Sequence, residues 1–303
     1  MQHTQDTGKF RQNTKDQFYT TDAVAAQCVC DIVSTLKPKT QTEAAKYLWI
    51  EPAAGKGAFI RSAPKKAEVI GIDIEPKAPG IVEMDFLEWT PPITTKKIIS
   101  FGNPPFGKQS SLAKAFIKKC CTFSDVIAFI LPLSFTKPSM SRAFDAKFHC
   151  IISKEIHSNS FEINEGVAYD VPCVFQIWQK RNDARNAEKD VSPEHFAYVK
   201  SPDTDAHDVA FRRVGVYAGR CFKIVNESQP DTNTSHAAAT TAFSKQSHHF
   251  MLFDEVARPH IDAIVKKINE HTFPSNTVGP RSLSKSEINT VINSIIREVI
   301  DES

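Results

Sequence analysis

The sequence predicts an α/β fold: a Rossmann-like domain on a mostly parallel sheet, followed by a smaller C-terminal α+β region. Two observations carry this prediction. The apolar run at residues 47–50 predicts a buried strand, and a turn of small residues leads from it into a helical pattern. A second strand pattern, at residues 68–75, ends in acids. Strand, helix and strand, continued by a loop and a further strand, is the order of a doubly wound sheet.

The first part of the chain predicts an arm and a helix. Residues 1–15 are polar and lack periodicity, so we expect a flexible arm. Thr21 or Asp22 can cap a helix that runs to about residue 36. We expect its buried face to consist of Val24, Cys28, Ile32 and Leu36.

The turn at residues 51–60 predicts a ligand-binding loop. Gly55 and Gly57 allow positive φ and a close backbone approach, while Ala53 and Ala54 leave room for a ligand. The loop is not a nicotinamide fingerprint, because residue 60 is isoleucine in place of the third glycine. It is not a triphosphate loop either, because it lacks the Gly-Lys-Ser/Thr pattern: Ala58 follows Gly57.

A second candidate site follows the apolar strand pattern at residues 97–100. Asn103 and two prolines form a turn in which the Asn103 side chain and the Pro104 carbonyl can point the same way as acceptors. Two adjacent acceptors suit a planar amino group with two hydrogens, and the nearby ring of Phe106 suits a flat ring. The exocyclic amine of a nucleobase has both features.

The rest of the chain continues the α/β pattern and then changes character. A helix is expected at residues 110–119, with strands at 125–132, 148–152 and 171–178. Beyond residue 180 we expect exposed connectors at 181–193 and 227–246, strands at 209–217 and 221–225, and helices at 256–268 and 288–300. Ser284 and Glu287 form the pattern of a capping box before the last helix.

Composition sets the class of protein. The 303 residues are 41% hydrophobic and 24% charged, which suits one large domain with a smaller appendage. No apolar run has membrane-spanning length, and the polar N-terminus does not resemble a secretory signal. We therefore expect a soluble intracellular protein, cytoplasmic or associated with the nucleoid or nucleus, with no membrane partner.

The seven cysteines include no Cys-x-x-Cys pair, so the sequence indicates neither a disulfide framework nor a zinc site, and no metal is expected. Cys173 lies in an apolar run and is predicted to be a small buried residue. The adjacent His248 and His249 are expected to be a solvent-facing or strand-edge pair.

The charge distribution favours a polyanionic partner. The net charge is only +2, but between Glu88 and Asp145 the sole acid is Asp125, and eight lysines and arginines surround the proline turn. Nucleic acid would be attracted there through its phosphates. A solvated helix face carrying lysines is the alternative. In the C-terminal region, Arg212, Arg213 and Arg220 could hold phosphates.

The sequence from Asn103 to Phe106 resembles the catalytic motif of S-adenosylmethionine-dependent amino-methyltransferases, above all the N6-adenine enzymes. Residues 51–59 resemble the Glu-Pro-x-x-Gly-x-Gly-x-Phe loop of the same family. The resemblance covers roughly residues 16–180, and its motif order is similar to the gamma group. It implies S-adenosyl-L-methionine as cofactor and a seven-stranded, mostly parallel sheet of the class I methyltransferase type.

The resemblance also implies roles for single residues. Asp73, with Glu75 as a near alternative, would accept from the cofactor ribose, and Asp85 from the cofactor adenine. The implied catalytic residues are Asn103, Pro104, Pro105 and Phe106. The implied cofactor-binding residues are Tyr19, Thr20, Thr21, Glu51, Ala53, Gly55, Gly57, Asp73, Asp85, Phe86 and Asn103. The expected substrate-binding residues are Phe106, Phe161, Lys108, Arg212 and Arg213, with Phe161 stacking on the target base.

The resulting hypothesis has three regions: an arm at residues 1–15, a catalytic domain at 16–180, and an accessory, substrate-recognising region at 181–303. The favoured reaction is methylation of the N6 amino group of adenine in DNA, with RNA left open because there is little room for a large target-recognition domain. N4-cytosine methylation is one alternative. A catalytically silent, nucleic-acid-binding subunit is another, and a protein partner is not indicated.

Overall fold

The computed structural model describes residues 18–36, 43, 46–156, 160–163, 167–169, 171–186, 189–202, 205–224, 243–275, 277 and 280–302. The chain divides into two compact units, with the boundary between residues 188 and 189. We call them the catalytic-type unit and the C-terminal unit. The arm expected at residues 1–15 lies outside the described residues, as do most of the connector expected at 227–246 and residues 157–159 of the loop before Phe161.

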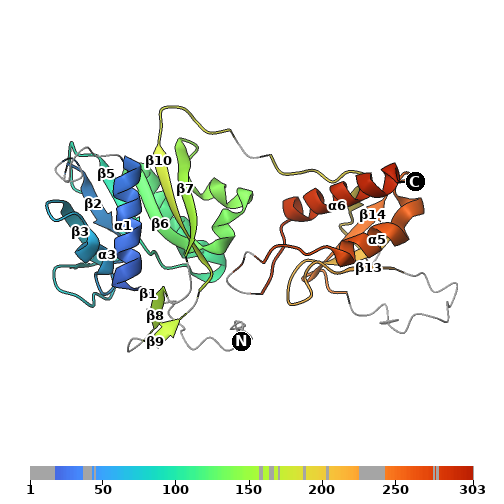
Figure 1. The fold of residues 1–303 in the computed structure, drawn as a ribbon, viewed down its shortest axis with the longest axis horizontal. Helices are drawn as coiled ribbons and strands as arrows, with labels where there is room; N and C mark the ends of the chain where they lie inside the picture. The colour runs from blue at the N-terminus through green and yellow to red at the C-terminus, as the bar shows by residue number, and fades with distance from the viewer. Residues whose placement is uncertain are drawn as a thin grey trace. The chain divides into compact units, whose positions relative to one another are not determined.

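A seven-stranded sheet forms the centre of the catalytic-type unit (Figure 1). Its strands are β2 (Leu48–Glu51), β3 (Glu68–Asp73), β4 (Val82–Glu83), β5 (Ile98–Gly102), β6 (Val126–Pro132), β7 (Phe148–Ile156) and β10 (Cys173–Lys180). The order is β4-β3-β2-β5-β6-β10-β7. Strand β10 runs antiparallel to both β6 and β7, and all other neighbouring pairs are parallel. This confirms the predicted seven-stranded, mostly parallel sheet of the class I methyltransferase type.

Apolar residues cover both faces of this sheet, which is why β2, β5 and β6 are buried along their whole length. On one face, helix α4 (Ser111–Phe123) buries Phe116 and Ile117 in a cluster with Phe129 of β6. On the other, the ring of Phe101 lies edge-on to Trp49 and to Phe59 of α3 (Ala58–Ser62).

Helix α1 (Asp22–Leu36) forms where the sequence predicts it, but its buried face differs from the prediction. The buried residues are Ala25, Cys28, Val29 and Ile32. The predicted face took every fourth residue, and a spacing of four drifts around a helix of 3.6 residues per turn. Alternating steps of three and four keep the stripe on one side, so Val24 and Leu36 lie outside it.

A second, three-stranded sheet lies in the same unit and was not predicted. It pairs β1 (Tyr19–Thr20) with β8 (Phe161–Ile163), and β8 with β9 (Val167–Tyr169), all antiparallel. Thr20 is opposite Phe161 in this sheet. The start of the described chain is therefore attached to a segment about 140 residues further on.

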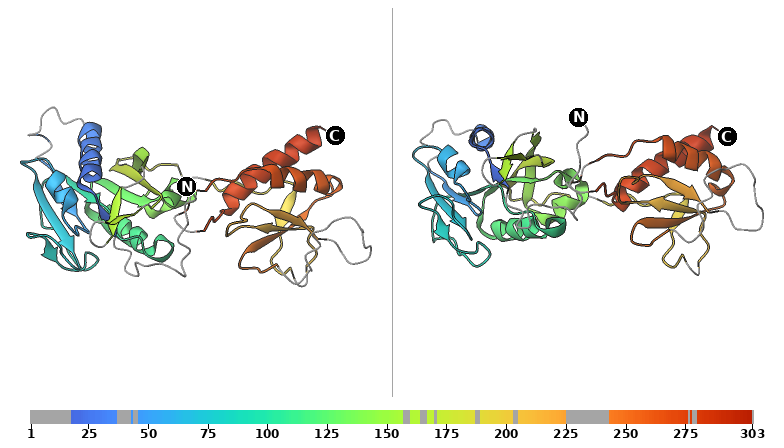
Figure 2. Two further views of the ribbon diagram at one scale, coloured as in Figure 1. Left: turned by 60° about the horizontal axis from the view of Figure 1, so that its bottom comes forward. Right: turned by 90° about the horizontal axis from the view of Figure 1, so that it is seen from below.

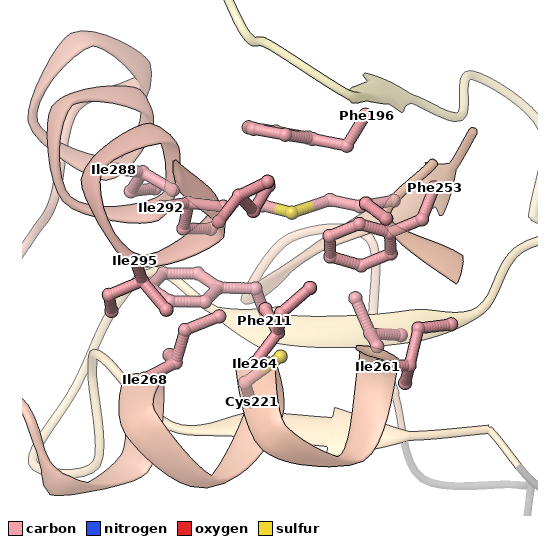
Figure 3. Close-up of a cluster of buried hydrophobic side chains, with 14 of the residues drawn as sticks. Phe196, Phe211, Cys221, Phe253, Ile261, Ile264, Ile268, Ile288, Ile292 and Ile295 are labelled. Atoms are coloured by element: carbon pink, nitrogen blue, oxygen red, sulfur yellow. The ribbon is translucent and has the colours of Figure 1, made fainter. Parts of the chain in front are cut away.

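The C-terminal unit packs two helices on a four-stranded antiparallel sheet (Figure 2). Its elements are β11 (Phe196–Tyr198), β12 (Val209–Arg212), β13 (Cys221–Lys223), β14 (His248–Phe253), α5 (Ile261–Glu270) and α6 (Lys285–Asp301). Figure 3 shows the core, where Phe211 and Phe253 of the sheet meet isoleucines of both helices. The predicted capping box is confirmed: Ser284 and Glu287 bond reciprocally at the start of α6.

Two predictions for this unit are corrected. His248 and His249 begin β14, which lies between β11 and β12, and His248 is buried; the pair is therefore neither at a sheet edge nor in solvent. The strand predicted at 209–217 ends at Arg212, because the chain turns there and Gly215 has a φ of +96°. Within the described ranges, no helix is long and apolar enough to cross a membrane.

Candidate active site

A cavity of about 310 Å³ lies at the carboxyl ends of β2, β3 and β5 in the catalytic-type unit. The strand order reverses between β2 and β5, and the crevice at such a reversal is the usual ligand site of an open α/β sheet. The lining residues come from six segments: Phe18, Tyr19, Pro52, Ala53, Gly55, Asp73, Ile74, Glu75, Asp85, Phe86, Leu87, Asn103, Pro105, Leu112 and Phe116.

Asp73 fixes the backbone of the glycine loop that follows β2. The Asp73 Oδ2 atom accepts from the Gly55 backbone N–H at 2.7 Å, and Oδ1 accepts from the Glu75 N–H at 2.8 Å. Gly55 has a φ of +50°, and a Cβ there would lie 3.2 Å from the Tyr19 ring. Glycine at residue 55 thus has a steric advantage, since both its conformation and the tight space beside Tyr19 disfavour a side chain.

The segment after β4 forms another wall. Asp85 Oδ1 accepts from the Leu87 N–H at 2.8 Å, and Phe86 is buried beside the cavity. Lys119 of α4 reaches this segment: its Nζ donates to the Leu87 carbonyl at 2.7 Å and lies 5.2 Å from the centre of the Phe86 ring. Lys119 therefore supports the cavity wall.

Asn103 has a fixed orientation in the proline turn. Its Nδ2 donates to the Phe18 carbonyl oxygen at 3.1 Å, across 85 residues of sequence. A carbonyl can only accept, so the amide nitrogen must face Phe18 and the amide oxygen must face elsewhere. The Asn103 Oδ1 atom is buried and has no hydrogen-bond partner among the described residues. The turn thus holds an unsatisfied acceptor on a residue that lines the cavity.

A buried acid lies at the base of the glycine loop. Glu51 is only 2% exposed, and its Oε2 has no partner among the residues that the structure describes. Burial raises the Glu51 pKa well above its usual value of 4.5, against the opposing effect of a hydrogen bond from the Ile60 backbone. A Cβ on Gly102 would lie 3.1 Å from Glu51 Cγ, so glycine at the end of β5 leaves room for this side chain.

The N-terminal segment joins these parts. Tyr19 lines the cavity, and Lys56 of the glycine loop lies 4.7 Å from the centre of its ring. Lys56 also forms an ion pair with Glu162 of β8 at 3.6 Å. Thr20 Oγ1 is buried without a partner in the described part of the chain. Strand β1 is thus in contact with the glycine loop, the proline turn and β8.

The structure brings together many of the predicted site residues but not all of them. Tyr19, Ala53, Gly55, Asp73, Asp85, Phe86, Asn103 and Pro105 line the cavity. Thr20, Thr21, Glu51, Gly57 and Pro104 belong to the same segments without lining it. Phe106 is buried near Phe18, with ring centres 6.2 Å apart, and Phe161 is only 1% exposed. Both would have to move to stack on a base, and their roles stay predictions.

The residues predicted to contact phosphates do not line this cavity. Lys108 is exposed at the start of a short 3-10 helix, η1 (Lys108–Ser110), after the proline turn. Arg212 and Arg213 belong to the C-terminal unit. In the described residues, no group of three or more histidines, cysteines or acids could hold a metal ion.

Sequence reasoning missed several residues of the cavity. Ile74, between the acids that follow β3, is 73% exposed and presents an apolar side chain there. Leu112 and Phe116 line the cavity from one side of α4, and their spacing of four residues was the signal available in the sequence. Phe18 acts through its backbone carbonyl, which its residue type could not indicate.

Comparisons with known proteins give structural matches only. No protein-family model matches the sequence, and a comparison with curated proteins finds no match. The 23S rRNA methyltransferase ErmE is similar at 15% identity and a TM-score of 0.41, over 55% of this chain and 71% of that one. A Thermoplasma acidophilum protein is similar at 18% identity and a TM-score of 0.39, over 57% of this chain and 94% of that one.

The M protein of the type I restriction enzyme EcoKI is similar at 14% identity and a TM-score of 0.40, over 55% of this chain and 45% of that one. At these values the matches carry no conclusion about activity. The fold assignment rests on the strand order itself.

Proposed function

We propose that this chain is an S-adenosylmethionine-dependent methyltransferase that acts on the N6 amino group of adenine in nucleic acid, with DNA favoured over RNA. The observation that carries the proposal is the orientation of Asn103. Its Nδ2 is occupied by the Phe18 carbonyl, and its Oδ1 is a buried acceptor without a partner among the described residues. Such an acceptor costs about 1 to 3 kcal/mol if it stays unpaired, so a donor from the substrate would be bound favourably.

The chemistry of an aromatic amino group explains why this acceptor matters. The nitrogen lone pair of adenine N6 is delocalised into the ring, which makes the amino group a weak nucleophile. If Asn103 Oδ1 and the Pro104 carbonyl accept its two hydrogens, lone-pair density concentrates on the nitrogen. A strong base is not needed. Positioning and hydrogen-bond electrostatics supplied by the proline turn would carry the rate enhancement.

The residues around the cavity fit the proposed cofactor, which supplies an electrophilic methyl group when bound. Asp73 and Asp85 lie at the ends of adjacent strands, where a nucleoside would meet a carboxylate acceptor at each end. Both carboxylates already accept backbone N–H groups, which fixes their positions, and each oxygen retains a second acceptor site. Ile74 and Phe86 offer apolar surface for a purine ring.

Two unsatisfied groups suit the amino-acid end of the cofactor. Glu51 Oε2 and Thr20 Oγ1 are both buried and unpaired within the described part of the chain. A ligand ammonium group would favour the ionised form of Glu51, whose pKa burial holds high. Tyr19 and Thr21 complete the segment that we assign to this end of the cofactor.

The test is to incubate the protein with labelled S-adenosylmethionine and single-stranded DNA, duplex DNA or RNA, and to identify the methylated nucleoside. We expect N6-methyladenine, with the Asn103→Ala variant as the inactive control. In duplex DNA the base must first leave the stack at a cost of a few kcal/mol, so a single strand should react faster. N4-methylcytosine as product would replace the proposal by its runner-up. Cofactor binding without transfer to any of the three would indicate a silent subunit.

A further inference from the structure

The turn between β12 and β13, residues 212–220, is rigidly built. Its ends are joined by hydrogen bonds from the Arg212 N–H to the Arg220 carbonyl at 2.7 Å and from the Gly219 N–H to the Arg212 carbonyl at 2.8 Å. Gly219 has a φ of +102°, and a Cβ there would lie 2.6 Å from the Phe273 ring. The turn is therefore seated directly on the core of the C-terminal unit.

This rigid turn exposes its two largest apolar side chains. Val216 is 80% exposed and Tyr217 is 64% exposed, while the next residue, Ala218, is buried. The Arg212 guanidinium lies 5.7 Å from the centre of the Tyr217 ring, within range of a cation–π contact. The ring is thus supported by an arginine while most of its surface stays accessible. Neither side chain is packed into the core of the unit, so both are accessible to a ligand.

Four arginines lie on this turn or in contact with segments packed against it, and they donate to neutral acceptors. Arg212, Arg213, Arg220 and Arg281 donate to the carbonyls of Val214, Gln246, Asn269 and Ala218, respectively. Among the described residues, none of the four forms an ion pair with a carboxylate. Arg297 of the same unit differs, because its Nε and Nη2 both donate to the Glu194 carboxylate.

The chain brings these arginines together from separate segments. The Gly215 N–H donates to the Arg281 carbonyl at 2.9 Å, which attaches the segment before α6 to the turn. The half-buried His249 lies in this positive field: its burial and the nearby charges of Arg213 and Lys285 together lower its pKa to about 4. His249 is therefore neutral at physiological pH, and the arginines supply the positive charge.

We propose that the β12–β13 turn binds a single-stranded segment of nucleic acid, with Tyr217 stacking on a base and Arg212, Arg213, Arg220 and Arg281 contacting phosphates. Unneutralised guanidinium groups bind phosphate oxygens well, and an exposed ring stacks on any unpaired base. A duplex hides its base faces, so the exposed ring favours a single strand. The inference rests on the proposed function only in naming nucleic acid as the substrate.

Fluorescence anisotropy of the full chain with labelled dT12 tests this surface, because that probe contains no adenine to methylate. Tyr217→Ala should weaken binding about 5-fold to 100-fold with an unchanged salt slope, and Tyr217→Phe should restore it. Replacing Arg212 and Arg220 together by glutamine should lower the slope of log affinity against log salt by about 1.4. Arg297→Gln is the matched control and should change neither quantity.

Parental affinity in both the Tyr217→Ala and the double arginine variant would overturn the proposal, provided that their melting temperatures match the parent. Loss of binding to a labelled poly-glutamate peptide, with dT12 binding intact, would assign the surface to an acidic protein and also overturn it. Methyl transfer by the unaltered protein is measured separately. If no transfer occurs but the variants lose dT12 binding, the proposed function fails and the surface stands.

Discussion

The two units of this chain present polar groups in opposite ways. In the catalytic-type unit the unsatisfied groups are acceptors or acids, namely Asn103 Oδ1, Glu51 Oε2 and Thr20 Oγ1, and all three are buried in the segments that build one cavity. In the C-terminal unit, Arg212 and Arg220 of the β12–β13 turn form no ion pair among the described residues, and the same turn exposes an aromatic ring. A concave site of acceptors suits a small ligand and an amino group. A cationic turn suits a polyanion.

The difference also lies in how the backbone is held. The cavity depends on side chains that clamp loops, since Asp73 bonds two backbone N–H groups and Asn103 bonds the Phe18 carbonyl. The β12–β13 turn depends on backbone bonds and on glycine packed against Phe273. Substitution of the cavity side chains that hold loops should therefore alter geometry as well as contacts, whereas substitution of the exposed Tyr217 on the turn should remove contacts alone.

The largest expected effect separates the two units by function. Asn103→Ala should lower methyl transfer by about 100-fold or more, because it removes an oriented acceptor on the reacting amino group. Cofactor affinity, measured by calorimetric titration, should fall much less than the rate, because only the Asn103 bond to the Phe18 carbonyl at the cavity wall is lost. Binding of dT12 should also be retained, since the variant leaves the C-terminal unit untouched. Near-normal turnover in this variant would contradict the mechanism.

The next effect distinguishes two acids within the cavity. Asp73→Ala should weaken cofactor binding by about 1 to 3 kcal/mol, and more than Asp85→Ala, because Asp73 also fixes the Gly55 N–H. Asp125 is a matched control: its Oδ2 accepts from the Ile98 N–H at the start of β5, the opposite end from the cavity. Asp125→Ala should leave cofactor affinity unchanged. Cofactor affinities equal to that of the parent in all three variants would show that the cavity is not the cofactor site.

The third prediction concerns pH. The pKa of Glu51 is raised in the folded protein, so its contribution to stability is fully present below the ordinary value of 4.5 and is lost as pH rises toward the folded pKa. Glu51→Gln has no ionisable group there. As pH rises between these two pKa values, the unfolding free energy of the parent should fall relative to that of Glu51→Gln by about 1.4 kcal/mol per pH unit. Urea unfolding at several pH values measures it, and a constant difference would mean that Glu51 ionises normally.

Much of the fold could be predicted because long apolar strands leave few alternatives. The runs that became β2, β5 and β6 are buried on both faces, and an acid, a glycine and a proline mark their respective ends. The strands β1, β8 and β9 could not be predicted, because two or three residues carry no periodicity. Strand β14 was missed because its run from His248 to Phe253 does not alternate between polar and apolar residues.

In the candidate site, too, some residues could be predicted from the sequence and others could not. The residues Gly55, Asp73 and Asp85 could be predicted, because each follows a strand whose carboxyl end meets the cavity. The contact between Asn103 and the Phe18 carbonyl could not, since it joins distant segments through a backbone atom. The burial of Phe161 depends on pairing of β8 with β1, which is a property of the folded chain.

The smallest expected effect compares the phosphate contacts of the two units. Lys108, Lys114 and Lys118 are exposed near the proline turn, whereas Lys119 supports the Phe86 wall and is excluded from the set. Replacing these three lysines by glutamine should lower the slope of log affinity against log salt for dT12 by no more than about 2. The decrease should be the same for unrelated sequences. Affinity should fall less than with the arginine variant, because a guanidinium holds phosphate with two parallel bonds and an ammonium does not.

Cofactor affinity should be unchanged in this lysine variant, and Lys119→Gln is the informative counterpart. Because Lys119 bonds the Leu87 carbonyl beside the cavity, its loss should weaken cofactor binding with no change in salt slope. An unaltered slope in the lysine variant, together with a lowered slope in the arginine variant, would place the phosphate contacts on the C-terminal unit and leave the lysines as a solvated helix face. The reverse pattern would move nucleic-acid binding to the rim of the cavity.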